Sequence, residues 1–160
     1  MIVTEKKQIL FILSLAVFLG LLRSYFLNDS EFTLIKKERL IKEVNSFLVP
    51  EDITGPMLVN LEFSKYHFDA GSAIFIDARD PEDFKSGHIQ NAINIPYDYY
   101  ENYEDAIEGL DDTGLYIIYC SGEECSLSID LADYLYTEKL IDKLLIFEGG
   151  WPQWRDAGYP

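Results

Sequence analysis

Short apolar runs recur through the second part of the chain, and their internal pattern predicts a parallel sheet. Five runs of four or five residues are separated by longer polar stretches. Within each run the apolar residues are largely continuous rather than alternating, which is typical of strands buried on both faces. The predicted strands are residues 57–61, 73–77, 92–95, 115–119 and 144–147.

The stretches between these runs predict helices. Pro81 begins one of them, where a first helical turn tolerates proline, and Glu82 and Asp83 favour the same end of a helix. Leu127 and Leu131 are spaced to lie on one helical face. The predicted helices are residues 64–70, 81–86, 103–110, 126–137 and 151–157. Strands that alternate with helices predict an α/β fold with a mainly parallel sheet.

The N-terminal segment has a different pattern. Residues 8–22 carry no charge, and the apolar character resumes after Arg23. A helix over residues 8–27 is about 30 Å long, which matches the hydrocarbon core of a bilayer. We therefore expect residues 1–27 to form a single-pass transmembrane anchor. A cleaved signal peptide and a buried core helix are the alternatives, although no small-x-small cleavage site follows the run.

Charge at the two ends of this segment predicts its orientation. Lys6, Lys7 and the amino terminus precede it and are partly offset by Glu5, whereas Arg23 is offset by Asp29 on the other side. The positive-inside rule then leaves the N-terminus in the cytoplasm and the following domain outside, on the periplasmic side in a bacterium.

Residues 28–56 are expected to link this anchor to a domain at 57–160. Apolar residues recur at helical spacing between positions 34 and 48, with charged residues between them, and Pro50 follows. This pattern predicts a linker helix over 34–48.

The acidity of the chain excludes one class of partner. From Glu31 onward the chain holds 10 Lys and Arg against 26 Asp and Glu, a net charge of −16. Nucleic-acid binding needs a basic face, so no nucleic-acid partner is expected. The chain also has two cysteines and two histidines, in a spacing that forms no zinc site. We expect neither a metal nor a cofactor.

Cys120 is the first candidate for chemistry. It ends the most apolar predicted strand, and the loop from Ser121 leads into a predicted helix. Ligands bind at the carboxyl ends of parallel strands, and a helix N-terminus there stabilises a thiolate. Cys120 is therefore a candidate nucleophile. The alternative is a buried cysteine that packs as a small hydrophobe.

Three blocks of sequence stand in order over about residues 58–160. They contain Asp77, Arg79, Phe84, Gly87, His88 and Ile89; Tyr119 and Cys120; and Gly149, Gly150, Trp151, Trp154 and Pro160. Together they resemble the rhodanese (sulfurtransferase) family. The first block resembles its D-x-R…F-x-x-G-H-I signature, the second its active-site strand and cysteine, and the third its C-terminal signature.

The resemblance implies an αβα sandwich with a five-stranded sheet. It also implies that Cys120 accepts sulfane sulfur as a persulfide and passes it to a thiophilic acceptor. The partners would be a sulfane sulfur donor and a thiol, including a protein thiol. The remaining marked residues would be structural: Asp77, Arg79, His88, Gly149, Gly150 and Trp151.

The loop after Cys120 departs from the usual family pattern. It contains the residues Ser121, Gly122, Glu123, Glu124, Cys125 and Ser126, which would form the substrate-binding loop. Two glutamates oppose small anionic donors such as thiosulfate, and no Arg or Lys occurs between positions 86 and 138. Ser126 stands where the related phosphatase branch has its phosphate-binding arginine, which argues against phosphatase activity.

The sequence leaves three roles open for Cys125. The first is a resolving thiol that forms a disulfide with Cys120, the second is a receiver of sulfur from a Cys120 persulfide, and the third is a packing residue under the loop. Three functions accordingly stay open: a sulfurtransferase, a binding or sensing module without turnover, and a thiol–disulfide protein.

An acidic, tyrosine-rich segment precedes the strand of Cys120. Residues 98–112 hold seven acids and no base, and tyrosines cluster at the start of this segment. Such a rim would suit a protein or thiol-peptide partner. The alternative is a solvated face with tyrosines partly packed.

Overall fold

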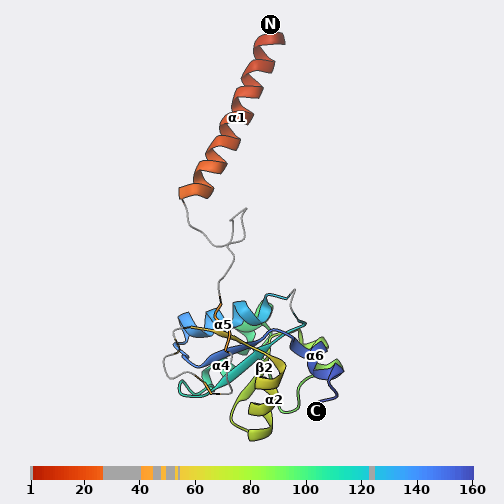
Figure 1. Cartoon of the computed structure of the whole chain (residues 1–160). Helices are drawn as coiled ribbons and strands as arrows, with labels where there is room; N and C mark the ends of the chain where they lie inside the picture. The colour runs from red at the N-terminus through yellow and green to blue at the C-terminus, as the bar shows by residue number, and fades with distance from the viewer. Residues whose placement is uncertain (1, 27–40, 45–47, 50–52, 54, 123–124) are drawn as a thin grey trace. The chain divides into compact units, whose positions relative to one another are not determined.

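The computed structural model describes residues 2–26, 41–44, 48–49, 53, 55–122 and 125–160 (Figure 1). The chain divides into two compact units, Met1–Leu40 and Ile41–Pro160. We describe each unit by itself.

The first unit contains one helix, α1 (Ile2–Phe26), in its described part. The large apolar side chains described along it are exposed, among them Phe11 and Phe18. Among the residues that the structure describes, no helix combines the length and the apolar character needed to cross a membrane. The predicted span covers residues 8–27, and its side chains from residue 20 onward lie outside the described part of the structure. The anchor stays a prediction.

The second unit is built on a five-stranded sheet in which every strand pair is parallel. Its strands are β1 (Met57–Val59), β2 (Ile74–Asp77), β3 (Ile93–Asn94), β4 (Tyr116–Tyr119) and β5 (Leu144–Phe147). The strand order is β1-β5-β4-β2-β3, so β4 lies at the centre. All residues of β4 and β5 are buried, which explains why these strands are apolar without alternation. The predicted α/β fold with a parallel sheet is confirmed.

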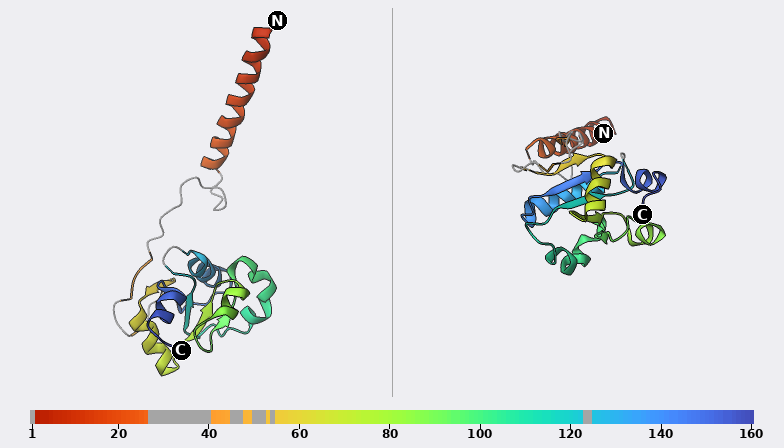
Figure 2. Two further views of the ribbon diagram at one scale, coloured as in Figure 1. Left: turned by 90° about the vertical axis from the view of Figure 1, so that its right-hand side faces the viewer. Right: turned by 60° about the horizontal axis from the view of Figure 1, so that its bottom comes forward.

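Helices cover both faces of the sheet (Figures 1 and 2). They are α2 (Leu61–Ala70), α3 (Pro81–Ser86), the 3-10 helix η1 (Tyr97–Tyr103), α4 (Glu104–Glu108), α5 (Leu127–Glu138) and α6 (Gly150–Asp156). Helices α5 and α4 contribute to one hydrophobic cluster, and α2 and α6 contribute to the other. The unit is therefore a three-layer αβα sandwich.

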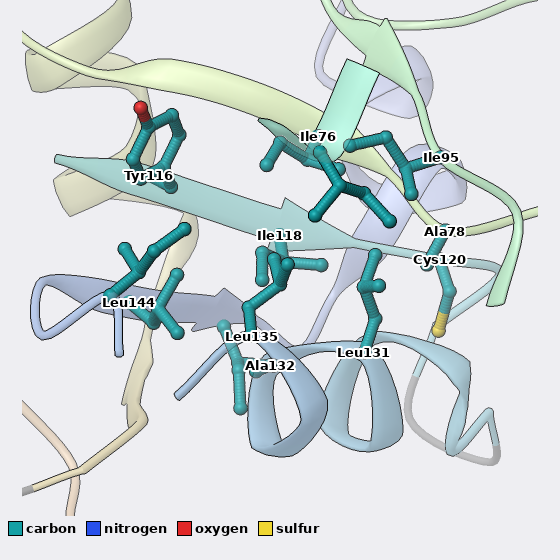
Figure 3. Close-up of a cluster of buried hydrophobic side chains, with 13 residues drawn as sticks. Ile76, Ala78, Ile95, Tyr116, Ile118, Cys120, Leu131, Ala132, Leu135 and Leu144 are labelled. Atoms are coloured by element: carbon teal, nitrogen blue, oxygen red, sulfur yellow. The ribbon is translucent and has the colours of Figure 1, made fainter. Parts of the chain in front are cut away.

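Side chains of β4 alternate between these two clusters. Tyr116 and Ile118 belong to the α5 side, and Ile117 and Tyr119 belong to the side of α2 and α6. Cys120 continues this alternation onto the α5 side, where Figure 3 shows its sulfur pointing toward the helix layer. The period of two along a strand thus decides which layer the thiol meets.

Residues 41–44 differ from the sequence prediction. They are extended rather than helical: Leu58 donates to the Lys42 carbonyl at 2.8 Å, and Val44 donates to the Leu58 carbonyl at 2.9 Å. Val44 is 4% exposed and belongs to a core cluster. The edge strand β1 has free backbone groups that need partners, and this segment supplies them. The predicted helix over 34–48 is therefore wrong at 41–44 and at Leu48, which is a bend, whereas residues 34–40 and 45–47 lie outside the described residues.

Candidate functional site

Cys120 lies directly after the central strand, at the carboxyl edge of the sheet (Figure 3). The chain leaves β4 for β5 on one side, whereas it leaves the neighbouring β2 for β3 on the other side. Connections that leave adjacent parallel strands in opposite directions open a crevice where α/β proteins bind ligands. The candidate nucleophile of the sequence thus stands at the switch point of the sheet.

A disulfide joins Cys120 to Cys125, and their Cα atoms are 6.5 Å apart. The Cys125 N–H also donates to the Gly122 carbonyl at 2.9 Å, which holds Cys125 close to the end of β4. Of the three roles considered for Cys125, the structure shows the disulfide partner. Glu123 and Glu124, predicted to belong to the substrate-binding loop, lie outside the described residues.

Ser128 is a site residue that the sequence reasoning missed. Its hydroxyl oxygen lies 3.4 Å from Sγ of Cys120, and the side chain is buried, with 2% exposed. A signal for it was present: Ser128 precedes Leu131 by three residues and Leu135 by seven, so it shares the buried face of α5. A polar residue on the buried face of α5, at the helix end near Cys120, indicates a residue of the candidate site.

The Gly149–Gly150 turn packs against the backbone of the Cys120 loop. Trp151 donates its N–H to the Cys120 carbonyl at 2.9 Å. Gly150 has a φ of 57°, and a Cβ there would lie 2.3 Å from the Cys120 carbonyl oxygen and 2.7 Å from the Gly122 nitrogen. Glycine at this position therefore permits both the left-handed backbone and the close approach of the two loops. The C-terminal sequence block thereby holds the carbonyl of the candidate nucleophile.

Asp77 and Arg79 form a buried ion pair at the end of β2. The Arg79 Nε donates to Asp77 Oδ1 at 3.0 Å, and Nη2 donates to Oδ2 at 2.6 Å. Nη2 also donates to the Gly87 carbonyl at 2.8 Å. Burial acts to lower the pKa of Arg79, but the hydrogen bond and charge of Asp77 outweigh it, and the pKa is raised. Asp77 and Gly87 therefore occupy this guanidinium, which links the end of β2 to the residue after α3.

Tyr119 and Trp151 pack around this ion pair. The Arg79 guanidinium carbon lies 5.9 Å from the Tyr119 ring centre and 5.7 Å from the Trp151 ring. The Tyr119 hydroxyl accepts the N–H of Ile89 at 3.0 Å. Burial, followed by the charge of Asp77, raises the pKa of Tyr119 well above its usual range. The tyrosine therefore stays neutral and anchors the loop that precedes β3.

His88 makes its contacts with α3. Its Nδ1 lies 2.8 Å from the Phe84 carbonyl, and its ring stacks on Phe84 with 3.8 Å between centres. These contacts link His88 to the end of α3, and its structural role stays a prediction.

The acidic segment at 98–112 lies on the α5 side of the sheet. Its seven acids are exposed, while Tyr100 and Tyr103 pack against the cluster that contains Cys120. Tyr100 also contacts Tyr134 of α5, with ring centres 4.3 Å apart. This is the solvated face with partly packed tyrosines that the sequence allowed as one alternative. Its use as a partner surface stays untested.

The fold and site together define a parallel α/β domain with a cysteine-centred site at its switch point. The model of the rhodanese-like domain matches residues 62–157, and the chain belongs to this family.

Solved structures of related domains have the same fold. The BH2092 protein from Bacillus halodurans is 26% identical, with a TM-score of 0.54 over 62% of this chain and 72% of that one. The rhodanese-like domain of the Alr3790 protein from Anabaena sp. is 20% identical, with a TM-score of 0.51 over 63% and 74%. Thiosulfate sulfurtransferase from Pseudomonas aeruginosa is 19% identical, with a TM-score of 0.50 over 64% of this chain and 19% of that longer one. No curated protein matches the chain.

Proposed function

We propose that this protein is a rhodanese-type sulfurtransferase. In this proposal Cys120 accepts sulfane sulfur as a persulfide and passes the sulfur to a thiol acceptor. The observation that carries the proposal is the position of Cys120, at the switch point of the sheet and with its Sγ 3.4 Å from the hydroxyl of Ser128 in the first turn of α5. Membership of the rhodanese-like family supports it.

The chemistry begins from the reduced form of the Cys120–Cys125 pair. The Cys120 thiolate attacks the outer sulfur of a sulfane donor, a new S–S bond forms, and the donor leaves as a thiolate with the bonding electron pair. The N-terminal turn of α5 stabilises negative charge on the bound sulfur. An acceptor thiolate then attacks the terminal sulfur and releases Cys120.

An organic persulfide or a polysulfide is a better donor than thiosulfate in this proposal. A small dianion needs a cationic partner, and the sequence has no Arg or Lys between positions 86 and 138. Arg79 follows the neighbouring strand β2, but it is engaged by Asp77 and Gly87. Donor selection would therefore rest on the organic part of the donor rather than on its charge.

Mass spectrometry of the reduced full-length chain in detergent tests the proposal. The chain is incubated with glutathione persulfide, polysulfide or thiosulfate. We expect the added mass of one sulfur atom on the peptide that contains Cys120 with the first two donors, and little with thiosulfate. The Cys120→Ser variant is the control and should take up none. No sulfur on Cys120 with any donor would reject the proposal.

We also propose that residues 8–27 anchor the chain in a membrane with the domain on the extracytoplasmic side. The apolar run supports the anchor, and the Cys120–Cys125 disulfide is the form expected in an oxidising compartment. Extraction of membranes with alkaline carbonate should leave the full chain in the pellet, whereas a chain lacking residues 1–27 should be released. Recovery of the full chain in the soluble fraction would contradict the anchor.

A further inference from the structure

We propose that Cys125 resolves the Cys120 persulfide and releases its sulfur as sulfide. This inference rests on the proposed function, because it needs a persulfide on Cys120. It adds a second catalytic cysteine and a defined product. The observation behind it is the disulfide between the two residues.

Burial limits what can reach the sulfur of Cys120. In the disulfide form the residue is 2% exposed, and its Sγ lies 3.4 Å from the Ser128 hydroxyl and 3.5 Å from the Cys125 carbonyl oxygen. A persulfide on Cys120 has two sulfurs, of which the outer one extends away from the residue. An acceptor from solution therefore meets the outer sulfur first, whereas the inner sulfur lies beside the Ser128 hydroxyl and the Cys125 carbonyl.

Cys125 reaches the inner sulfur from within the loop. Its bond to Sγ of Cys120 shows that the two sulfur atoms come into contact in this fold. The hydrogen bond from the Cys125 N–H to the Gly122 carbonyl holds Cys125 near Cys120. A thiol held next to its target reacts at a high effective concentration, without the entropy loss of a bimolecular encounter.

The step balances without an added oxidant. The Cys125 thiol loses its proton to solvent, and its thiolate attacks Sγ of the Cys120 persulfide. The Cys120–Cys125 disulfide forms while the bond between the inner and outer sulfurs breaks. The outer sulfur leaves with the bonding electron pair and takes up a proton as hydrosulfide. The sulfane sulfur is thereby reduced, and the two cysteines are oxidised to the disulfide.

The product of this step has two consequences. Hydrosulfide is the conjugate base of an acid stronger than an alkyl thiol, so it is a good leaving group for attack at the inner sulfur. The disulfide then blocks Cys120 until an external dithiol reduces it. The complete cycle consumes a sulfane donor and a dithiol, and it produces sulfide and a disulfide.

The test separates loading from resolution. The reduced full-length chain is loaded with glutathione persulfide and freed of donor by rapid desalting, with no thiol added. Wild-type protein should release about one equivalent of sulfide per chain and lose both alkylatable thiols. The Cys125→Ser variant should load sulfur on Cys120, keep it, and release no sulfide until a thiol is added. Ser86→Ala, which changes an exposed hydroxyl on α3, is the control and should behave as wild type.

Two results would overturn the inference while leaving the proposed function intact. In the first, wild-type protein keeps its persulfide, releases no sulfide and forms no disulfide. In the second, the added sulfur is found on Cys125, which would make that residue a receiver of sulfur. A Cys125→Ser variant that is folded but takes no sulfur from any donor would instead reject the proposed function itself.

Discussion

Ser128 carries the first prediction at the scale of single residues. Its hydroxyl is 3.4 Å from Sγ of Cys120, so in the reduced protein it can donate to the thiolate. A hydrogen bond to a charged group contributes about 1.5–3 kcal/mol, and we expect Ser128→Ala to slow persulfide formation about tenfold or more. Because the Cys120 thiolate loses a hydrogen-bond donor, the rise of the rate with pH should occur at a higher pH in the variant than in wild type. A stopped-flow pH–rate profile measures both effects.

Thr137 gives the matched control for this prediction. It lies in the last turn of the same helix, and its hydroxyl donates to the Asp133 carbonyl at 2.8 Å, away from the loop. Thr137→Val removes a hydroxyl from α5 and should leave the pH–rate profile unchanged. An unchanged profile for Ser128→Ala as well would show that Ser128 only fills space.

Gly150 carries the second prediction at this scale. A side chain there meets both a left-handed backbone and the Cys120 carbonyl oxygen, 2.3 Å from the position of its Cβ. We expect Gly150→Ala to lower the free energy of unfolding by about 3 kcal/mol. Gly158 has a φ of 73° with no atom within 4 Å of its Cβ position, so Gly158→Ala should cost about 1 kcal/mol. Denaturant unfolding compares the two, and equal losses would contradict the role of the close approach.

At the scale of single residues, only part of the candidate site could be predicted from the sequence. The positions of Cys120 after a strand and of Gly150 in a turn were predictable, because each residue stands in a motif whose neighbouring residues favour that local structure. The pairing of Cys120 with Cys125 was not, because three roles fit the same spacing and only the folded structure, in which Cys125 bonds the Gly122 carbonyl, selects one. Ser128 was missed because its contact with Cys120 depends on how α5 is rotated against the sheet.

At the scale of elements, the Asp77–Arg79 pair ties β2 to the loop after α3. Arg79 bonds both the carboxylate of Asp77 and the carbonyl of Gly87, and both charged side chains are buried. Removing one partner leaves the other charge buried and unpaired, so Asp77→Asn should destabilise the domain by about 3 kcal/mol. The Arg155–Asp156 pair is exposed, and Asp156→Asn should cost less than about 1 kcal/mol. Thermal unfolding of both variants checks this, and similar losses would contradict it.

The bounds of the strands were predicted to within a few residues where their apolar runs are buried on both faces. Residues 115–119, for example, correspond to β4 at Tyr116–Tyr119. The prediction failed where packing decides the conformation. The helical spacing near residue 41 was misleading, because Val44 is buried by pairing with an edge strand and not by one face of a helix. Likewise, the helix predicted at 103–110 is preceded by the 3-10 helix η1 at Tyr97–Tyr103, which no periodic pattern marks.

At the scale of the whole molecule, the folded unit is larger than the region that the family model matches. The match begins at residue 62, whereas the compact unit begins at Ile41. The difference includes β1 and the segment that pairs with it through Lys42 and Val44. We therefore expect a chain of residues 41–160 to fold, and a chain of residues 57–160 to lose about 2–4 kcal/mol of unfolding free energy.

Point variants within the 41–160 chain separate the two contributions to this loss. Val44→Ala removes part of a buried side chain but keeps the backbone hydrogen bonds, so it should cost about 1–2 kcal/mol. Lys42→Ala alters an exposed side chain and leaves its carbonyl in place, so it should cost almost nothing. Urea unfolding of the four proteins gives the comparison. If residues 57–160 proved as stable as residues 41–160, the pairing with β1 would contribute no stability, and the domain would begin at the edge strand itself.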